Sequence, residues 1–114
     1  MNNIVREKSF RFALRIVKLC QYLQKEKREH VMTKQLLRCG TSIGANVAES
    51  EHAQSRADFT SKLNIALKEA AETDYWLRLF HESGYLSDAE FRSVYADCKE
   101  MERLLAAIVK TAKE

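Results

Sequence analysis

The chain contains no proline and only three glycines among its 114 residues. Because these residues are the usual interrupters of regular structure, their scarcity predicts long, continuous helices. No run of about 18 uncharged apolar residues occurs, so we expect no membrane span, and the basic N-terminus lacks the apolar stretch of a signal peptide. We therefore expect an all-α protein that is cytoplasmic and has no membrane partner.

Cysteine is scarce as well, and its pattern argues against a disulfide framework. Cys20, Cys39 and Cys98 are odd in number, form no CxxC motif and fall on three different expected helices. No histidine or other base stands at a spacing that would support a reactive thiol. The sequence therefore predicts free, buried thiols, with no metal ligand and no cofactor.

Apolar periodicity predicts four helices in a single domain that spans residues 1–114. The chain is long enough to build one core of its own. Since the connections between the helices are short, neighbouring helices should run antiparallel, as in an up-down-up-down four-helix bundle. The expected helices cover residues 4–28, 33–50, 55–83 and 87–113.

Polar residues mark the expected helix starts. Thr33 is a candidate N-cap of the second helix. Ser55 would open the third helix, with Asp58 at a position that favours the positive helix end. Ser87 and Glu90 form a capping box at the start of the fourth.

The first expected helix carries more apolar surface than one core requires. Four of its apolar residues recur with the helical period and should face the core: Phe12, Ile16, Leu19 and Leu23. Three others project to a different side: Phe10, Leu14 and Val17. The pattern fits either one wide buried arc or a core face beside a subunit interface.

Small residues recur every four positions in the second expected helix, at Gly40, Gly44 and Ala48. A glycine inside a helix costs about 1 kcal/mol relative to alanine, so a compensating close approach of a neighbouring backbone is expected. A phosphate-binding glycine loop is the rival interpretation, but the motif lacks a GK[ST] ending and follows no strand. Asn46 and Glu49 lie near this ridge, where we expect hydrogen bonds and ion pairs that tie helices together.

Charge is distributed unevenly along the chain. Residues 1–40 contain ten Lys and Arg against three Asp and Glu, whereas residues 41–114 contain nine against thirteen. On the first helix, polar residues at steps of three and four form one stripe: Lys8, Arg11, Arg15, Lys18, Tyr22 and Lys25. Such a stripe could contact the phosphates of a nucleic acid with little sequence preference. The alternatives are a solvated face or a face paired with acidic groups.

Acidic residues gather on one side of the third expected helix, away from its core line. Glu69 and Glu72 share this side with Ile65 and Trp76. We favour a structural interpretation in which Arg38 or the first-helix bases bridge to these carboxylates within or between subunits. Trp76 would then pack at the seam and contribute to a subunit interface.

Two enzymatic interpretations of the acidic residues remain open. A di-metal carboxylate bundle requires paired Glu-x-x-His motifs, and only Glu49 and His52 have that spacing. A magnesium-dependent all-α pyrophosphohydrolase would use Glu69-x-x-Glu72 with a second acidic pair, Asp97 and Glu100, which project away from the core line of their helix. Because no nucleophile, base and orienting group form a set, we predict that the protein is not an enzyme.

The segment from residue 34 to residue 79 resembles the bacterial 23S rRNA intervening-sequence proteins, also called the S23 ribosomal protein family. The similarity extends to residues 7–19 and 81–91. It is carried by Gly40, Gly44, Asn46, Ala48, Glu49, Glu69, Glu72, Tyr75 and Trp76. The resemblance implies a four-helix bundle, a ring-like homopentamer and a connection to rRNA.

The resulting hypothesis is a homo-oligomeric accessory protein that associates with rRNA or another nucleic acid. In this interpretation the stripe on the first helix contacts phosphates, while Phe10, Leu14, Val17 and Trp76 form the subunit interface. The alternative is a protein-binding scaffold, or a passenger protein, with no nucleic-acid ligand. Binding of RNA that weakens with added salt would separate the two.

Overall fold

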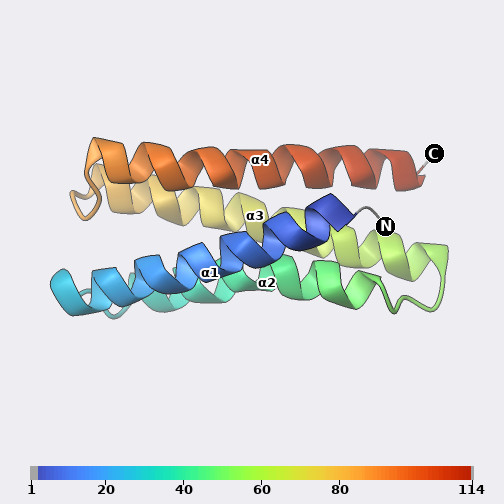
Figure 1. Cartoon of the computed structure of the whole chain (residues 1–114), viewed down its shortest axis with the longest axis horizontal. Coiled ribbons are helices and arrows are strands. Elements are labelled where there is room, and N and C mark those ends of the chain that lie inside the picture. The colour runs from blue at the N-terminus through green and yellow to red at the C-terminus, as the bar shows by residue number, and fades with distance from the viewer. Residues whose placement is uncertain (1–2, 114) are drawn as a thin grey trace.

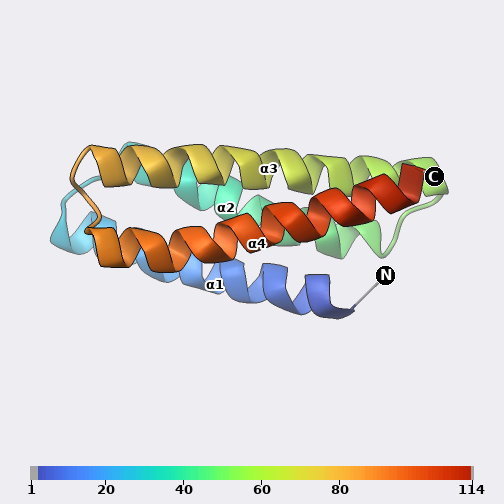
Figure 2. The same cartoon turned by 90° about the horizontal axis from the view of Figure 1, so that it is seen from above.

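The computed structural model describes residues 3–113 and contains four long helices (Figure 1). Each helix runs antiparallel to the next, so α1 begins and α4 ends at the same end of the bundle (Figure 2). The predicted all-α antiparallel bundle is confirmed, and the helix ends lie within two residues of the predicted ones. The helices are α1 (Asn3–Glu26), α2 (Met32–Ser50), α3 (Arg56–Glu82) and α4 (Asp88–Lys113).

The bundle is elongated, with principal extents of 44 × 20 × 19 Å. Its centre is filled by aliphatic side chains together with Phe80, Met101 and the three cysteines, all of them buried. The thiols are free, as predicted. Burial raises the pKa of Cys39 to about 11 and that of Cys20 to about 12, so both remain protonated at neutral pH. Within residues 3–113, none of the helices combines the length and apolarity of a membrane span.

The contact between α1 and α2 depends on the absence of side chains at two positions. A Cβ atom added to Gly40 would lie 2.7 Å from Cγ2 of Ile16, which is fully buried. A Cβ atom added to Gly44 would lie 3.1 Å from the carbonyl oxygen of Ser9. The two glycines therefore permit a close approach of α2 to α1, and this approach offsets their poor helix propensity.

The start of α2 corrects one prediction. Thr33 is not the N-cap; it lies inside the helix, which begins at Met32 after Val31. The carboxylate of Glu29 accepts hydrogen bonds from the backbone N–H groups of Val31, Met32 and Thr33 at 3.1, 2.9 and 2.9 Å. Arg28 adopts a left-handed backbone conformation (φ 54°), which places Glu29 after the end of α1. A carboxylate thus supplies the cap that the sequence pattern assigned to a hydroxyl.

The other two predicted caps are confirmed. The Ser55 hydroxyl accepts from the N–H of Asp58 at 3.0 Å, and the Asp58 carboxylate accepts from the N–H of Gln54. At α4 the Ser87 hydroxyl accepts from the N–H of Glu90, whose carboxylate accepts in turn from the N–H of Ser87 at 2.8 Å. These reciprocal bonds fix where α3 and α4 begin.

Candidate nucleic-acid interface

Two bases of the α1 stripe form ion pairs with α4. The Lys8 ammonium lies 2.7 Å from the Glu100 carboxylate, and the Arg15 guanidinium lies 2.7 Å from that of Asp97. Arg15 also donates to the backbone carbonyl of Ser93 at 3.3 Å. All four charged side chains are about 40% exposed or more, so each pair contributes at most about 1 kcal/mol to stability. Part of the stripe is thereby neutralised within the chain.

The other three bases of the stripe point to solvent. Arg11, Lys18 and Lys25 are exposed and form no ion pair or hydrogen bond with any side chain of residues 3–113. They stand seven residues apart, close to two helical turns, so they occupy one ridge along α1. Glu7 lies one turn before Arg11 on this ridge. The ridge is therefore predominantly cationic over about four turns beyond that point.

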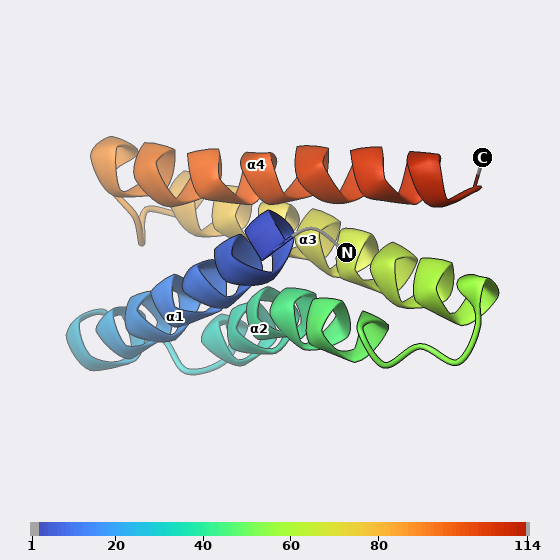
Figure 3. The same cartoon turned by 45° about the vertical axis from the view of Figure 1, so that its right-hand side comes forward.

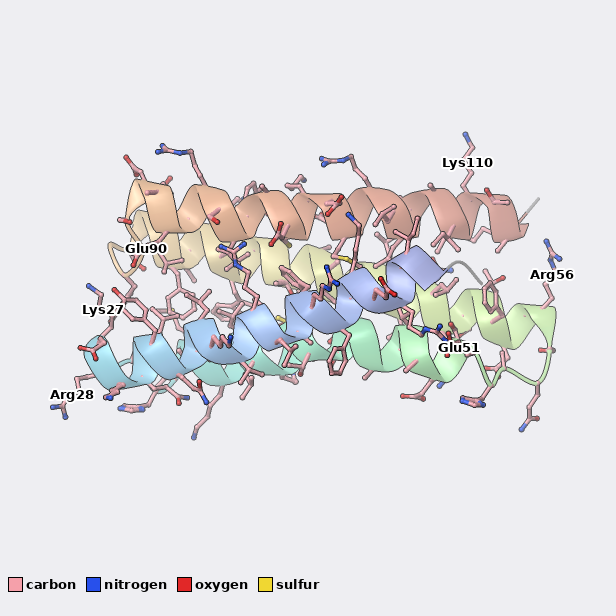
Figure 4. All side chains as sticks on the ribbon, viewed as in Figure 1. Lys27, Arg28, Glu51, Arg56, Glu90 and Lys110 are labelled. Carbon is pink, nitrogen blue, oxygen red and sulfur yellow. The ribbon has the colours of Figure 1, made fainter. Side chains whose placement is uncertain are left out.

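Tyr22, which belongs to the predicted stripe, is half-buried and packs against the core. The Lys27 ammonium lies 6.0 Å from the centre of its ring. The backbone N–H of Ser87, and to a lesser degree the Tyr22 hydroxyl, lower the pKa of Glu90. Figure 4 shows Lys27 and Glu90 near the end of the bundle where α1 ends and α4 begins. Tyr22 thus connects α1 to α4 and is not presented for base stacking.

The seam between α1 and α4 is hollowed at two places, because α1 crosses α4 at a clear angle (Figure 3). The hollows have volumes of about 210 and 280 Å³. The first is lined in part by Lys8, Arg11 and Glu100, and the second by Arg15, Lys18 and Tyr22. Water and ions can therefore reach the α1 stripe through the hollows in the α1–α4 seam as well as from its solvent-facing side.

The acidic side of α3 faces α2. The Arg38 guanidinium binds the carboxylates of Glu69, at 2.9 Å, and Glu72, at 2.5 Å. The Trp76 indole N–H donates to Glu72 at 3.0 Å, and the ring packs edge-on against Tyr75. Arg38, and then Trp76, lower the pKa of Glu72. Of the two bridges expected, the one with Arg38 forms within the chain, while the α1 bases pair with α4 instead.

The carboxylates considered for a metal site lie on two different seams. Glu69 and Glu72 bind Arg38 between α2 and α3, whereas Asp97 and Glu100 bind the α1 bases. The structure therefore does not bring the two pairs of the pyrophosphohydrolase interpretation together. Among residues 3–113, no three His, Cys, Asp or Glu side chains are placed to share one metal ion.

The residues near the glycine ridge play different roles. Glu49 accepts from the Lys62 ammonium at 3.1 Å and so connects α2 to α3. Asn46 was expected to tie helices together, but its amide donates to the carbonyl of Ser42 in its own helix at 2.8 Å. Ala48 is exposed rather than packed at the close approach. Of the three small residues, Gly40 and Gly44 therefore lie at the close approach to α1.

Apolar side chains are exposed on two helices. Phe10 and Leu14 on α1 are 65% and 49% exposed, and Val17 beside them is half-buried. On α3, Ile65 and Tyr75 are 41% and 50% exposed. The face that the sequence left undecided is thus open to solvent in the single chain.

Sequence reasoning missed a second group of bases, on α4. Arg92, Arg103 and Lys110 are exposed, and they stand eleven and seven residues apart, close to three and two helical turns. That spacing is visible in the sequence and could have revealed the group. It was hidden because α4 as a whole contains as many acidic as basic residues.

The contact between α3 and α4 contains a buried polar network that the sequence pattern also did not reveal. Asp74, which is 7% exposed, accepts from the Tyr95 hydroxyl and the Arg78 guanidinium, each at 2.9 Å. It also accepts from the Lys99 ammonium at 3.2 Å. Burial, and then the adjacent Asp74, raise the pKa of Glu102 to about 7. This network holds α4 against α3.

These features define an antiparallel four-helix bundle whose surface carries ridges of charged side chains. The family model described as 23S rRNA-intervening sequence protein matches residues 1–107. The chain belongs to that family.

One solved structure is similar to the chain along most of its length. It is a protein with unknown function from the S23 ribosomal protein family of Bacteroides thetaiotaomicron VPI-5482. The two sequences are 54% identical, the match covers 93% of this chain and 98% of the other, and the TM-score is 0.92. No curated protein matches the chain.

Proposed function

We propose that this protein is a homo-oligomeric accessory protein that associates with RNA through phosphate contacts and has no catalytic activity. The observation that supports the proposal most directly is the ridge of Arg11, Lys18 and Lys25, three exposed bases without an acidic partner in residues 3–113. The family description, which refers to 23S rRNA, favours RNA as the polyanion. Three free cysteines agree with a reducing cytoplasm.

Assembly is the second element of the proposal. A ring in which each subunit contacts the next head-to-tail needs two different surfaces on every subunit. The exposed apolar residues Phe10 and Leu14 on α1, and Ile65 and Tyr75 on α3, supply two such candidates. The resemblance to the family implies a pentamer, in which the α1 ridge would be repeated around the ring and the positive potential of the subunits would add.

Charge reversal tests the contact surface. Arg11→Glu combined with Lys18→Glu should weaken binding of a labelled structured RNA at least about tenfold. Lys34→Glu combined with Lys68→Glu provides a control, because both positions are exposed on other helices and the change in net charge is identical. Fluorescence titration at one salt concentration measures both variants. Equal weakening by the two variants would reject the α1 ridge as the contact surface.

A single substitution tests the assembly. Leu14→Asp should reduce the mass measured by light scattering, because a carboxylate would be buried without a partner at the interface. Gln21→Asp, at an exposed position of the same helix, should leave the mass unchanged. An unaltered oligomer in the Leu14 variant would contradict the proposed interface.

A further inference from the structure

The outer ridge of α4 carries its own row of bases, formed by Arg92, Arg103 and Lys110. The three positions are separated by nearly whole numbers of helical turns, so the side chains leave the helix in almost the same direction. Figure 4 shows Lys110 pointing away from the bundle. Exposed alanines, among them Ala96 and Ala107, lie between the bases. The side chains between the bases are therefore small, so a polyanion can approach this side of α4 closely.

The carboxylates of α4 do not neutralise this row. Asp97 and Glu100 point to α1, where they bind Arg15 and Lys8. Glu102 lies against α3 and Lys99.

Among residues 3–113, Glu100, which binds Lys8, stands three residues before Arg103, and an acidic residue also lies near Arg92. Asp88 lies one turn before it, and its pKa is lowered mainly by His81 and to a small extent by Arg92. Arg103 and Lys110 form no ion pair with any side chain of residues 3–113.

The α4 row and the α1 ridge lie on neighbouring helices, on either side of the α1–α4 seam. The middle of the seam is occupied by the two ion pairs and is close to neutral. The surface thus presents two separate lines of positive charge. Neither line contains an aromatic side chain. Proteins that bind single strands usually provide aromatic platforms for the bases, whereas duplexes are bound largely through their two lines of phosphates.

We propose that the α4 row is a second phosphate-contact surface and that the partner is a nucleic-acid double helix, with one strand contacting each row. The proposal rests on the proposed function and adds the form of its ligand. A duplex of RNA and a duplex of DNA share the chemistry that the rows recognise, so the experiment includes both.

The test uses the full-length protein and three labelled probes: an RNA duplex, the DNA duplex of the same sequence, and one RNA strand alone. The variant Arg103→Gln with Lys110→Gln is compared with Lys34→Gln with Lys68→Gln, which removes the same charge from α2 and α3. The wild type should bind a duplex at least about tenfold more tightly than the single strand. The α4 variant should weaken duplex binding about tenfold more than the control and lower the salt slope by about 2.

Equal losses in the α4 variant and the control would overturn the proposal, and so would single-strand binding as tight as duplex binding. In either case the wild type still binds nucleic acid, and the proposed function stands. If the wild type binds none of the three probes at low salt, the proposed function is contradicted, and the duplex proposal that rests on it is contradicted as well. The tighter of the two duplexes identifies the source of the ligand. Because all four substituted positions are exposed, unchanged helix content by circular dichroism checks that both variants fold.

Discussion

Helix α1 contacts its two neighbours, α2 and α4, through different kinds of interaction. Against α2, the contact is made by backbone and buried apolar atoms, with Gly40 and Gly44 allowing the helices to approach. Against α4, long charged side chains bridge a hollowed seam. At the two glycines the first contact depends on shape, whereas the second is bridged by exposed charged groups. The difference indicates that α2 fixes the position of α1, while the bases facing α4 are held only by exposed ion pairs.

The largest effect should come from filling the close contact. In Gly44→Leu the new Cβ would meet the Ser9 carbonyl, a backbone atom that cannot rotate away. We expect a loss of about 2–3 kcal/mol in the free energy of unfolding, measured by chemical denaturation. Ala45→Leu, at the next and exposed position, should change it by less than about 0.5 kcal/mol. Similar values for the two variants would show that the α1–α2 contact is not shape-dependent.

The next largest effect on stability should come from a substitution in the connection between α1 and α2. Glu29→Ala removes the acceptor of three backbone N–H groups and should cost about 1–2 kcal/mol. Burial alone would raise the pKa of Glu29, but these N–H groups outweigh it and lower the pKa. The stabilisation is therefore present above the ordinary pKa of a carboxyl group and is lost as the pH falls through the lowered value.

Denaturation of the wild type and the Glu29 variant at neutral and acidic pH measures this difference. The difference in unfolding free energy between the wild type and the Glu29 variant should be smaller at acidic pH. Glu26→Ala, which changes an exposed carboxylate at the end of α1, serves as the control and should have little effect at either pH. A gap that is constant with pH would contradict the capping role.

The attachment of α4 to α3 supplies a pH-dependent comparison. Glu102 has its pKa raised from 4.5 to about 7 by burial and by Asp74, so its protonated form stabilises the fold. This contribution is complete below about pH 4.5 and is lost as the pH rises through about 7. Arg78, Tyr95, Cys98 and Lys99 are the other titratable groups in contact with this pair.

We expect the unfolding free energy of the wild type to fall by about 1–2 kcal/mol, relative to Glu102→Gln, between about pH 5 and pH 8. The amide is neutral throughout and mimics the protonated acid. Chemical denaturation at intervals across this range provides the measurement, with Glu82→Gln, at an exposed position, as the control. Parallel curves for the wild type and the Glu102 variant would contradict the assignment.

The smallest effect on stability should come from the α1–α4 seam. Asp97→Asn combined with Glu100→Gln removes both exposed ion pairs and should cost less than about 1 kcal/mol in chemical denaturation. The same change frees Arg15 and Lys8, so RNA binding should tighten several-fold, with a salt slope larger by up to about 2. A large loss of stability, or unchanged RNA binding, would contradict the difference drawn between the α1–α2 contact and the α1–α4 contact.

The sequence was sufficient to predict the helices and most of the core, because apolar period and local capping act within a few turns of each helix. Ser55 and Ser87 illustrate this, since each cap involves residues at most three positions away. Thr33 was misassigned because the residue that caps α2 is a carboxylate four positions earlier, and a left-handed Arg28 is needed to place it.

The site was less predictable than the fold. The periodic spacing on α1 places the bases on one stripe, but it contains no information on which of them contact α4. The pairing of Lys8 and Arg15 with α4 depends on the angle at which the two helices cross, which is a property of the whole bundle. The same limit applies to Asp74. Arg78 belongs to the same helix, but Tyr95 and Lys99 come from α4, more than twenty residues later in the chain.

The most direct test of the account is the salt dependence of RNA binding by the wild-type protein, with its mass determined by light scattering in the same buffer. We predict an oligomer that binds a labelled structured RNA with a micromolar or lower Kd at low salt. A plot of log Kd against log salt should have a slope of at least about 3, from the three exposed bases of each α1 ridge. An oligomer that does not bind RNA even at low salt would contradict the account and favour a protein-binding scaffold.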